Sequence, residues 1–187
     1  VLREMTAAQG ADSPETLRAF DAALFGHGAF IAGNFVRAFL HALSGGRVAP
    51  APSNAAPEMQ RYYQAVNRFS TALALLSDVS MFTLGGTLKR RESITGRLGD
   101  ILSQMYLISS ALKRFEDEGR PVEDAPLVHW SVQDALVRAQ DALDGVLANF
   151  PNRGIAGLLR ALIFPFGSPY HKPSDALAAQ VAELMQT

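Results

Sequence analysis

The sequence contains no cysteine, which excludes a disulfide framework, thiolate zinc sites and cysteine nucleophiles. It also has almost no net charge, because 17 basic and 18 acidic residues in 187 give −1 at pH 7. That balance argues against a general nucleic-acid binder and against an acidic tail. Apolar residues are abundant instead, at 48 % of the chain, which excludes wholesale disorder.

Strand patterns are missing as well, since no long stretch alternates apolar and polar residues. Apolar residues recur instead with the period of a helix. Helices are therefore expected over 14–43, 58–88, 98–115, 124–149, 155–164 and 174–185. The prediction is an all-α fold, an antiparallel bundle of about four long helices with short helices at the ends, forming one domain over residues 1–187.

Glycine and proline suggest where these helices begin and end. Ser13-Pro14 is a typical helix start, and Ser174-Asp175 predicts the cap of the last helix. Gly26 and the glycines after it predict a bend or a division of the first helix. Residues 48–57 hold three prolines and predict a loop, and Gly85-Gly86 predicts a break or a weakening of the second helix.

Motifs for metal, nucleotide or acyl-transfer chemistry are absent from the sequence. The four histidines form no His-x-x-x-His pair, and there is no G-x-G-x-x-G, Walker or G-x-S-x-G pattern. We therefore expect neither a metal site nor a catalytic centre in this chain. Its first residue is Val1, and we expect it to be a piece of a longer protein.

Asp78 is the only charged residue between Phe69 and Leu88. A charge at the centre of a membrane span would cost a few kcal/mol, so this run predicts a buried bundle helix rather than a span. We expect Asp78 to be buried in a structural ion pair with a basic residue of the next segment, namely Lys89, Arg90, Arg91 or Arg97. Two alternatives are a catalytic base at Asp78 and a phosphate contact at Lys89, Arg90 or Arg91.

The segment 152–170 is apolar and carries only Arg153 and Arg160 among its first fifteen residues. It is too short to span a bilayer, which takes about 20 apolar residues. One interpretation is a helix buried in its own domain. The other is a contact surface for a catalytic core, a second subunit or a membrane, formed by Ile155, Leu158, Leu159, Leu162, Phe164 and Phe166.

Four stretches, read together, carry a resemblance to a known family. They are RYYQAVNRFSTALALLSDVSMFTLGGTLKRRESITGRLGDILSQMYLISSALKRFEDEGR, PLVHWSVQDAL, NFPNRGIAGLLRALIFPFG and PSDALAAQVAELM. In this order they resemble the C-terminal part of bacterial long-chain acyl-CoA dehydrogenases of the FadE type, which act in fatty-acid β-oxidation.

This resemblance implies a parent oxidoreductase that is a flavoprotein with FAD, and a catalytic glutamate in a Glu-Gly motif upstream of the matched region. The present sequence has no Glu-Gly-x-Asn stretch, because Glu118-Gly119 is followed by Arg120-Pro121. We therefore expect no catalytic residue, no cofactor-binding residue and no metal ligand in this chain, and FAD only in the parent enzyme.

The first hypothesis is a non-catalytic C-terminal helical domain that packs on its own catalytic flavin domain, mediates subunit contact in a homodimer, or both. The alternatives are a stand-alone helical protein-interaction module and a domain that contributes CoA-phosphate contacts. The resemblance implies a bacterial cytoplasmic location, with peripheral contact to the inner membrane left open. Nucleic acid is not expected as a partner.

Overall fold

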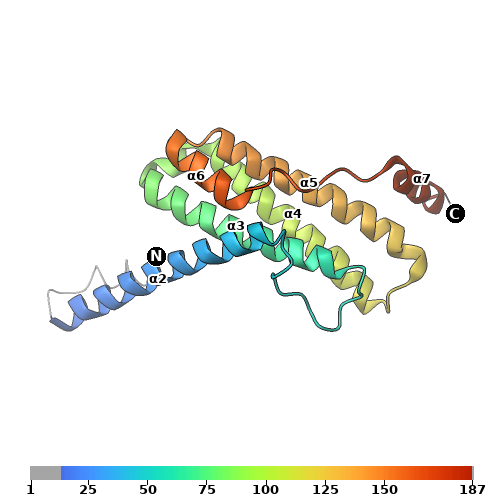
Figure 1. Ribbon diagram of the computed structural model, residues 1–187, viewed down its shortest axis with the longest axis horizontal. Coiled ribbons are helices and arrows are strands. Elements are labelled where there is room, and N and C mark those ends of the chain that lie inside the picture. The colour runs from blue at the N-terminus through green and yellow to red at the C-terminus, as the bar shows by residue number, and fades with distance from the viewer. Residues whose placement is uncertain (1–13, 187) are drawn as a thin grey trace.

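The computed structural model describes residues 14–186, and this part of the chain is helical with no strand. The all-α prediction is confirmed. The elements, shown in Figure 1, are α2 (Pro14–Leu43), α3 (Gln60–Leu84), the 3-10 helix η1 (Gly85–Arg90), α4 (Glu92–Asp117), the 3-10 helix η2 (Val122–Asp124), α5 (Ala125–Ala148), α6 (Arg153–Ile163) and α7 (Asp175–Leu184).

Three of these helices, α3, α4 and α5, run antiparallel to their chain neighbours and form the body of the molecule (Figure 1). The C-terminal half of α2 lies along α3, while its N-terminal half extends away from the bundle. After α5 the chain turns back, so α6 packs on α5 and α2. An extended segment then leads to α7 at the opposite end of α5.

The hydrophobic core centres on one side of α5. Val132, Ala139, Leu143 and Val146 are completely inaccessible to solvent, and they recur at spacings of three, four and seven residues. That spacing places them on one face of a helix. Facing them are buried side chains of the neighbouring helices, including Phe69, Leu75, Leu76, Ile101, Ile108, Leu112 and Leu159.

Local sequence signals explain several helix ends. The Asn152 side chain accepts a hydrogen bond from the Ile155 amide (3.1 Å), and the Ser174 hydroxyl accepts one from the Leu177 amide (3.3 Å). Both are N-cap bonds, and the cap predicted at Ser174 is confirmed. Ser13 and the residues before it lie outside the described part of the chain. Gly119, with φ +83°, follows the end of α4 in the left-handed conformation that glycine adopts readily.

The glycines of the first two helices have opposite effects. The predicted division of the first helix near Gly26 is wrong, because α2 is a single α-helix from Pro14 to Leu43. An isolated glycine costs a helix only about 1 kcal/mol relative to alanine, which does not by itself end the helix. Gly85, in contrast, has φ +48° and ψ −129° and ends α3, so Gly85-Gly86 is a true break.

His41 lies near the C-terminal end of α2 and is buried against α3. Its Nδ1 lies 3.3 Å from the Thr71 hydroxyl. Burial lowers the pKa of His41, and the positive charges of Arg37 and Arg68 lower it further. The folded protein therefore binds a proton at this site less readily than the unfolded chain does.

The pH dependence of stability should reflect this burial. The pKa of histidine in the unfolded chain is about 6.5. As the pH falls through that value, the unfolded chain binds a proton that the folded protein binds less readily, and the free energy of unfolding decreases. We expect the free energy of unfolding to fall between about pH 7.5 and pH 5.5, and to fall less in His41→Gln. Urea denaturation at several pH values measures this, with the exposed His171→Gln as control. Equal pH dependence in wild type and His41→Gln would contradict the assignment.

The core around α5 gives a second prediction. Leu143 is fully buried, so Leu143→Ala removes apolar contacts and leaves a cavity, at a cost of about 2–5 kcal/mol in the free energy of unfolding. Leu102 on α4 is 58 % exposed, and Leu102→Ala should change stability by no more than about 0.5 kcal/mol. Denaturant midpoints of the two variants test the contrast, and similar midpoints would show that the core lies elsewhere.

Candidate functional site

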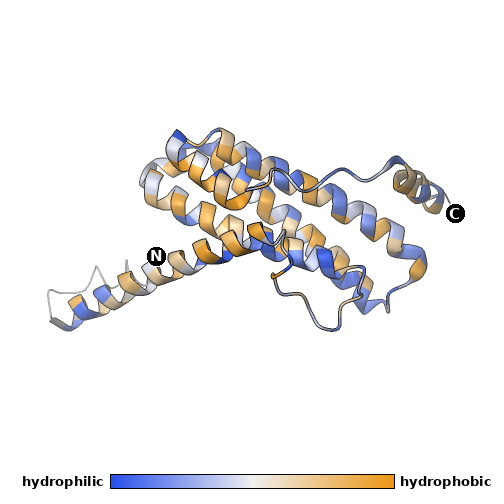
Figure 2. Ribbon diagram, in the orientation of Figure 1, coloured by the Kyte–Doolittle hydropathy of each residue, from blue (hydrophilic) through white to orange (hydrophobic). Residues whose placement is uncertain are grey.

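The most distinctive surface of the molecule is one face of α2. The apolar side chains that compose it, defined here as the α2 face, are Leu24, Phe25, Phe35, Val36, Phe39, Leu40 and Leu43, all exposed by 38–77 %. Their spacing places them along one broad side of the helix. No charged residue occurs between Asp21 and Arg37. In Figure 2 this helix is coloured mostly white to orange along its middle, with blue segments near its N-terminal end.

The opposite side of α2 attaches the helix to the bundle. Asn34, Ala38, His41 and Ala42 are buried there. The Asn34 amide donates to Asp78 Oδ2 (3.4 Å), and Arg37 donates to Asn34 Oδ1 (2.7 Å). The Arg37 bond lies within α2 and orients the Asn34 side chain, whereas the Asn34–Asp78 bond and the contact of His41 Nδ1 with the Thr71 hydroxyl (3.3 Å) hold this side of α2 against α3. The α2 face consequently points away from the bundle that supports it.

Asp78 differs from the prediction in both burial and partner. It is half-buried, and its carboxylate accepts the hydrogen bond from Asn34 of α2. Within residues 14–186, no ion pair joins Asp78 to Lys89, Arg90, Arg91 or Arg97. The side of α3 that carries Asp78 faces α2, so the carboxylate does not reach the segment that follows.

The basic residues proposed as its partners lie elsewhere. Lys89 and Arg90 end η1 and Arg91 precedes α4, and all three are exposed. Arg97 donates to the Ser93 carbonyl (3.2 Å) and lies over Gly145 of α5, where a Cβ would come within 2.7 Å of its Nε. Gly145 thus allows α4 and α5 to approach closely around the Arg97 side chain.

The contact surface proposed for segment 152–170 is largely internal. Leu159, Leu162 and Phe164 are buried, and Ile155 is half-buried. The reason is that α6 folds back onto α5 and α2, which cover its apolar side. The exposed members of the set are Leu158 (56 %) and Phe166 (79 %).

Sequence analysis thus overlooked the α2 face, although its signal was present in the sequence. Residues 22–36 contain no charge but include several aromatic and aliphatic side chains. The glycines in this stretch favour a helix break, and a broken helix would not present a continuous apolar face. Apolar periodicity alone also does not reveal which side of a helix has a neighbour.

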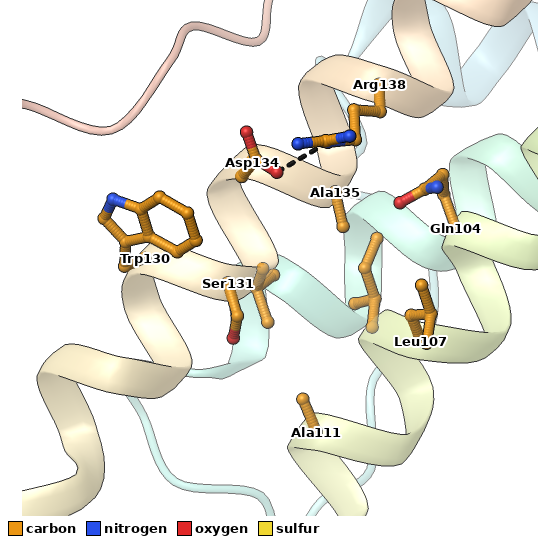
Figure 3. A pocket seen from close by; sticks show the side chains of 10 residues that line it. Gln104, Leu107, Ala111, Trp130, Ser131, Asp134, Ala135 and Arg138 are labelled. Carbon is orange, nitrogen blue, oxygen red and sulfur yellow. Dashed lines mark hydrogen bonds and ion pairs between the residues drawn. The ribbon is translucent and has the colours of Figure 1, made fainter. Parts of the chain in front are cut away.

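A shallow pocket of about 390 Å³ lies between α4 and α5, shown in Figure 3. Gln104, Leu107 and Ala111 contribute from α4, and α5 contributes Trp130, Ser131, Asp134, Ala135 and Arg138. The charged groups here neutralise each other, since Arg138 Nε donates to Asp134 Oδ2 at 2.6 Å. This arrangement offers apolar surface rather than a free acid, base or nucleophile.

The described residues do not form a site that fits FAD or a metal ion. No group of three or more histidine, aspartate or glutamate side chains converges among them. Gly45-Gly46 and Gly85-Gly86 each follow the C-terminus of an α-helix, whereas the glycines that hold dinucleotide phosphates precede a helix N-terminus.

By length and composition alone, two helical stretches reach the threshold for a membrane span, Leu17–Leu43 and Gln60–Arg90. The core helices of globular proteins pass the same test. The second stretch includes α3, whose Phe69, Leu75 and Leu76 are buried in the core.

Comparison with known proteins identifies the family. No solved structure gives a significant match to the chain. A family model described as "Acyl-CoA dehydrogenase, C-terminal, bacterial type" matches residues 1–187. The match covers the whole sequence, in agreement with the resemblance carried by the four stretches quoted above. The chain therefore belongs to the family of bacterial-type acyl-CoA dehydrogenase C-terminal domains.

Proposed function

We propose that this chain is the non-catalytic C-terminal domain of an FAD-dependent acyl-CoA dehydrogenase of fatty-acid β-oxidation, and that its α2 face packs against the catalytic part of the same enzyme. The observation that carries the proposal is the α2 face itself, seven exposed apolar side chains on a helix whose C-terminal half is held by the bundle on its other side. Family membership suggests which partner covers the α2 face. The matching family is the C-terminal part of acyl-CoA dehydrogenases, so the catalytic part of the same enzyme is the candidate.

The energetics favour a covered rather than a solvated α2 face. Apolar surface gains about 25 cal/mol for each Å² removed from water, and large contiguous patches on a protein surface mark interaction sites. Phe35, Val36 and Phe39 are exposed to 38–53 % while the backbone beneath them is already ordered. A partner that covers these side chains therefore buries apolar surface, while the α2 backbone loses little further conformational entropy.

A protein partner fits this face better than a lipid surface. Helices that lie in a membrane interface are rich in lysine and arginine on their polar side. Between Glu15 and Leu43, α2 carries two basic side chains, Arg18 and Arg37, against two acidic ones, Glu15 and Asp21. The proposed role places the domain with its parent enzyme in the bacterial cytoplasm.

Matched substitutions test the docking role. We expect Val36→Asp to weaken association with a separately produced catalytic part at least tenfold, because a carboxylate at a buried interface loses its hydration. Val122→Asp is the control, since Val122 is 84 % exposed and lies in η2, away from α2. Titration calorimetry measures both affinities, and far-UV circular dichroism verifies that both variants fold.

Two outcomes separate the partners. If Val36→Asp binds the catalytic part as wild type does but dissociates a dimer of the parent enzyme in light scattering, the α2 face is a subunit contact instead. If Val36→Asp changes neither association nor oligomeric state, the docking proposal is wrong.

The non-catalytic role gives a separate prediction. The purified chain should be colourless and should not oxidise palmitoyl-CoA with an artificial electron acceptor, because it lacks the Glu-Gly-x-Asn stretch and the described residues do not fit FAD. Visible absorption and an acceptor-reduction assay measure this. A yellow protein that turns over substrate would refute the proposal.

A further inference from the structure

A second feature lies at the end of α3 opposite to η1, where three distant segments of the chain enclose a small pocket. Its volume is about 220 Å³. Arg61, Gln64 and Arg68 line it from the first turns of α3, Arg47 from the loop after α2, and Tyr170 from the extended segment before α7. The three arginines give this pocket a concentration of positive charge.

Arg68 is the unusual member, because its side chain is buried without a carboxylate. It is 6 % exposed, and its Nη2 donates to the Ile163 carbonyl at 2.9 Å. Its guanidinium also lies over the rings of Phe164 (5.7 Å) and Tyr170 (5.8 Å). All of these partners are neutral, whereas a buried charge is normally balanced by an opposite one.

The other two arginines are also without an acidic partner. Arg61 donates to Gln64 Oε1 (3.0 Å), and Gln64 donates to the Arg47 carbonyl (3.3 Å). Over residues 14–186, none of Arg47, Arg61 and Arg68 forms an ion pair, although arginines elsewhere on the helices do so with neighbouring carboxylates. The pocket thus holds three positive charges that no acidic side chain of the described region offsets.

The helix ends near the pocket do not cancel this charge. The C-terminus of α2 contributes about half a negative elementary charge, against three full positive ones. Two of its last carbonyls are also occupied, since His41 O accepts from the Gly46 amide at 2.6 Å and Ala42 O accepts from the Gly45 amide at 3.1 Å. An anion in the pocket would meet guanidinium donors rather than free carbonyl oxygens.

From this arrangement we propose that Arg47, Arg61 and Arg68 form a binding site for a phosphate monoester group. Guanidinium groups match phosphate oxygens with paired hydrogen bonds, and a dianion balances more of the local charge than a single carboxylate. A volume of about 220 Å³ is below the range of 300–1,000 Å³ typical of whole-ligand pockets, so it suits the phosphate group alone. The α2 face is not part of this pocket, and the proposal does not depend on the docking role.

Titration calorimetry on the protein tests the proposal with three probes. Inorganic phosphate measures the site itself, and coenzyme A, compared with dephospho-coenzyme A, measures whether a phosphate monoester on a larger molecule is the source. Binding of coenzyme A in preference to the dephospho form assigns the source to a carrier-linked phosphate. Binding of inorganic phosphate with no preference for coenzyme A over the dephospho form would show a site for the free ion and would overturn the assignment to a monoester. Absence of heat with every probe up to about 10 mM would overturn the proposal.

Variants connect the binding to the named residues. Arg61→Gln and Arg47→Gln change exposed side chains, and each should weaken phosphate binding about tenfold or more by removing a charge-assisted hydrogen bond. Arg68→Gln should weaken it further, and if that variant does not fold, the other two suffice. Arg90→Gln is the control, because Arg90 is exposed in the separate basic cluster of η1 and should leave binding unchanged. Wild-type affinity in Arg61→Gln and Arg47→Gln, or an equal loss in Arg90→Gln, would overturn the assignment.

Discussion

The packing of α5 against α4 is the contact on which the other helices depend. The inner face of α5 is fully buried, and it carries Val132, Ala139, Leu143 and Val146. Val132, Leu143 and Val146 each contribute about 1.5–3 kcal/mol of apolar transfer free energy, a large share of the net stability of a domain of this size, and the smaller Ala139 contributes less. Since α3, α6 and α7 all contact α5, its burial positions elements that are distant from one another in the sequence.

The stability of α2 is unevenly distributed along its length. Its C-terminal half has buried side chains against α3, the Asn34–Asp78 hydrogen bond and the His41–Thr71 contact. Its N-terminal half extends past the bundle (Figure 1), and exposed Leu17, Leu24 and Phe25 lie there. Isolated helices are marginal in water unless an apolar face is covered, so the N-terminal half of α2 receives less stabilisation from tertiary packing than the C-terminal half does.

Helix caps, loops and helix breaks could be predicted from the sequence. The rotation of each helix about its axis, and the elements that pack against it, could not. The cap at Ser174, the loop over 48–57 and the break at Gly85 follow from residue types whose preferences act within a few residues. The partner of Asp78 depends on which way α3 is turned, and the burial of α6 depends on where the chain folds back after α5. The arginine pocket is formed by residues 47, 61–68 and 170, which are far apart in the sequence. No local sequence motif therefore predicts it.

Gln140 holds the C-terminal segment in an uncommon way. Its side-chain amide donates to the Tyr170 carbonyl (3.0 Å) and accepts from the Tyr170 amide (2.9 Å), as a neighbouring strand would. Beyond this clamp, α7 has no buried residue of its own, whereas α5 has ten. Local openings of a protein range in free energy from nearly zero to that of global unfolding. We therefore expect the amide hydrogens of α7 to exchange with solvent through an opening that leaves the bundle folded, and those at the buried centre of α5 to exchange much more slowly.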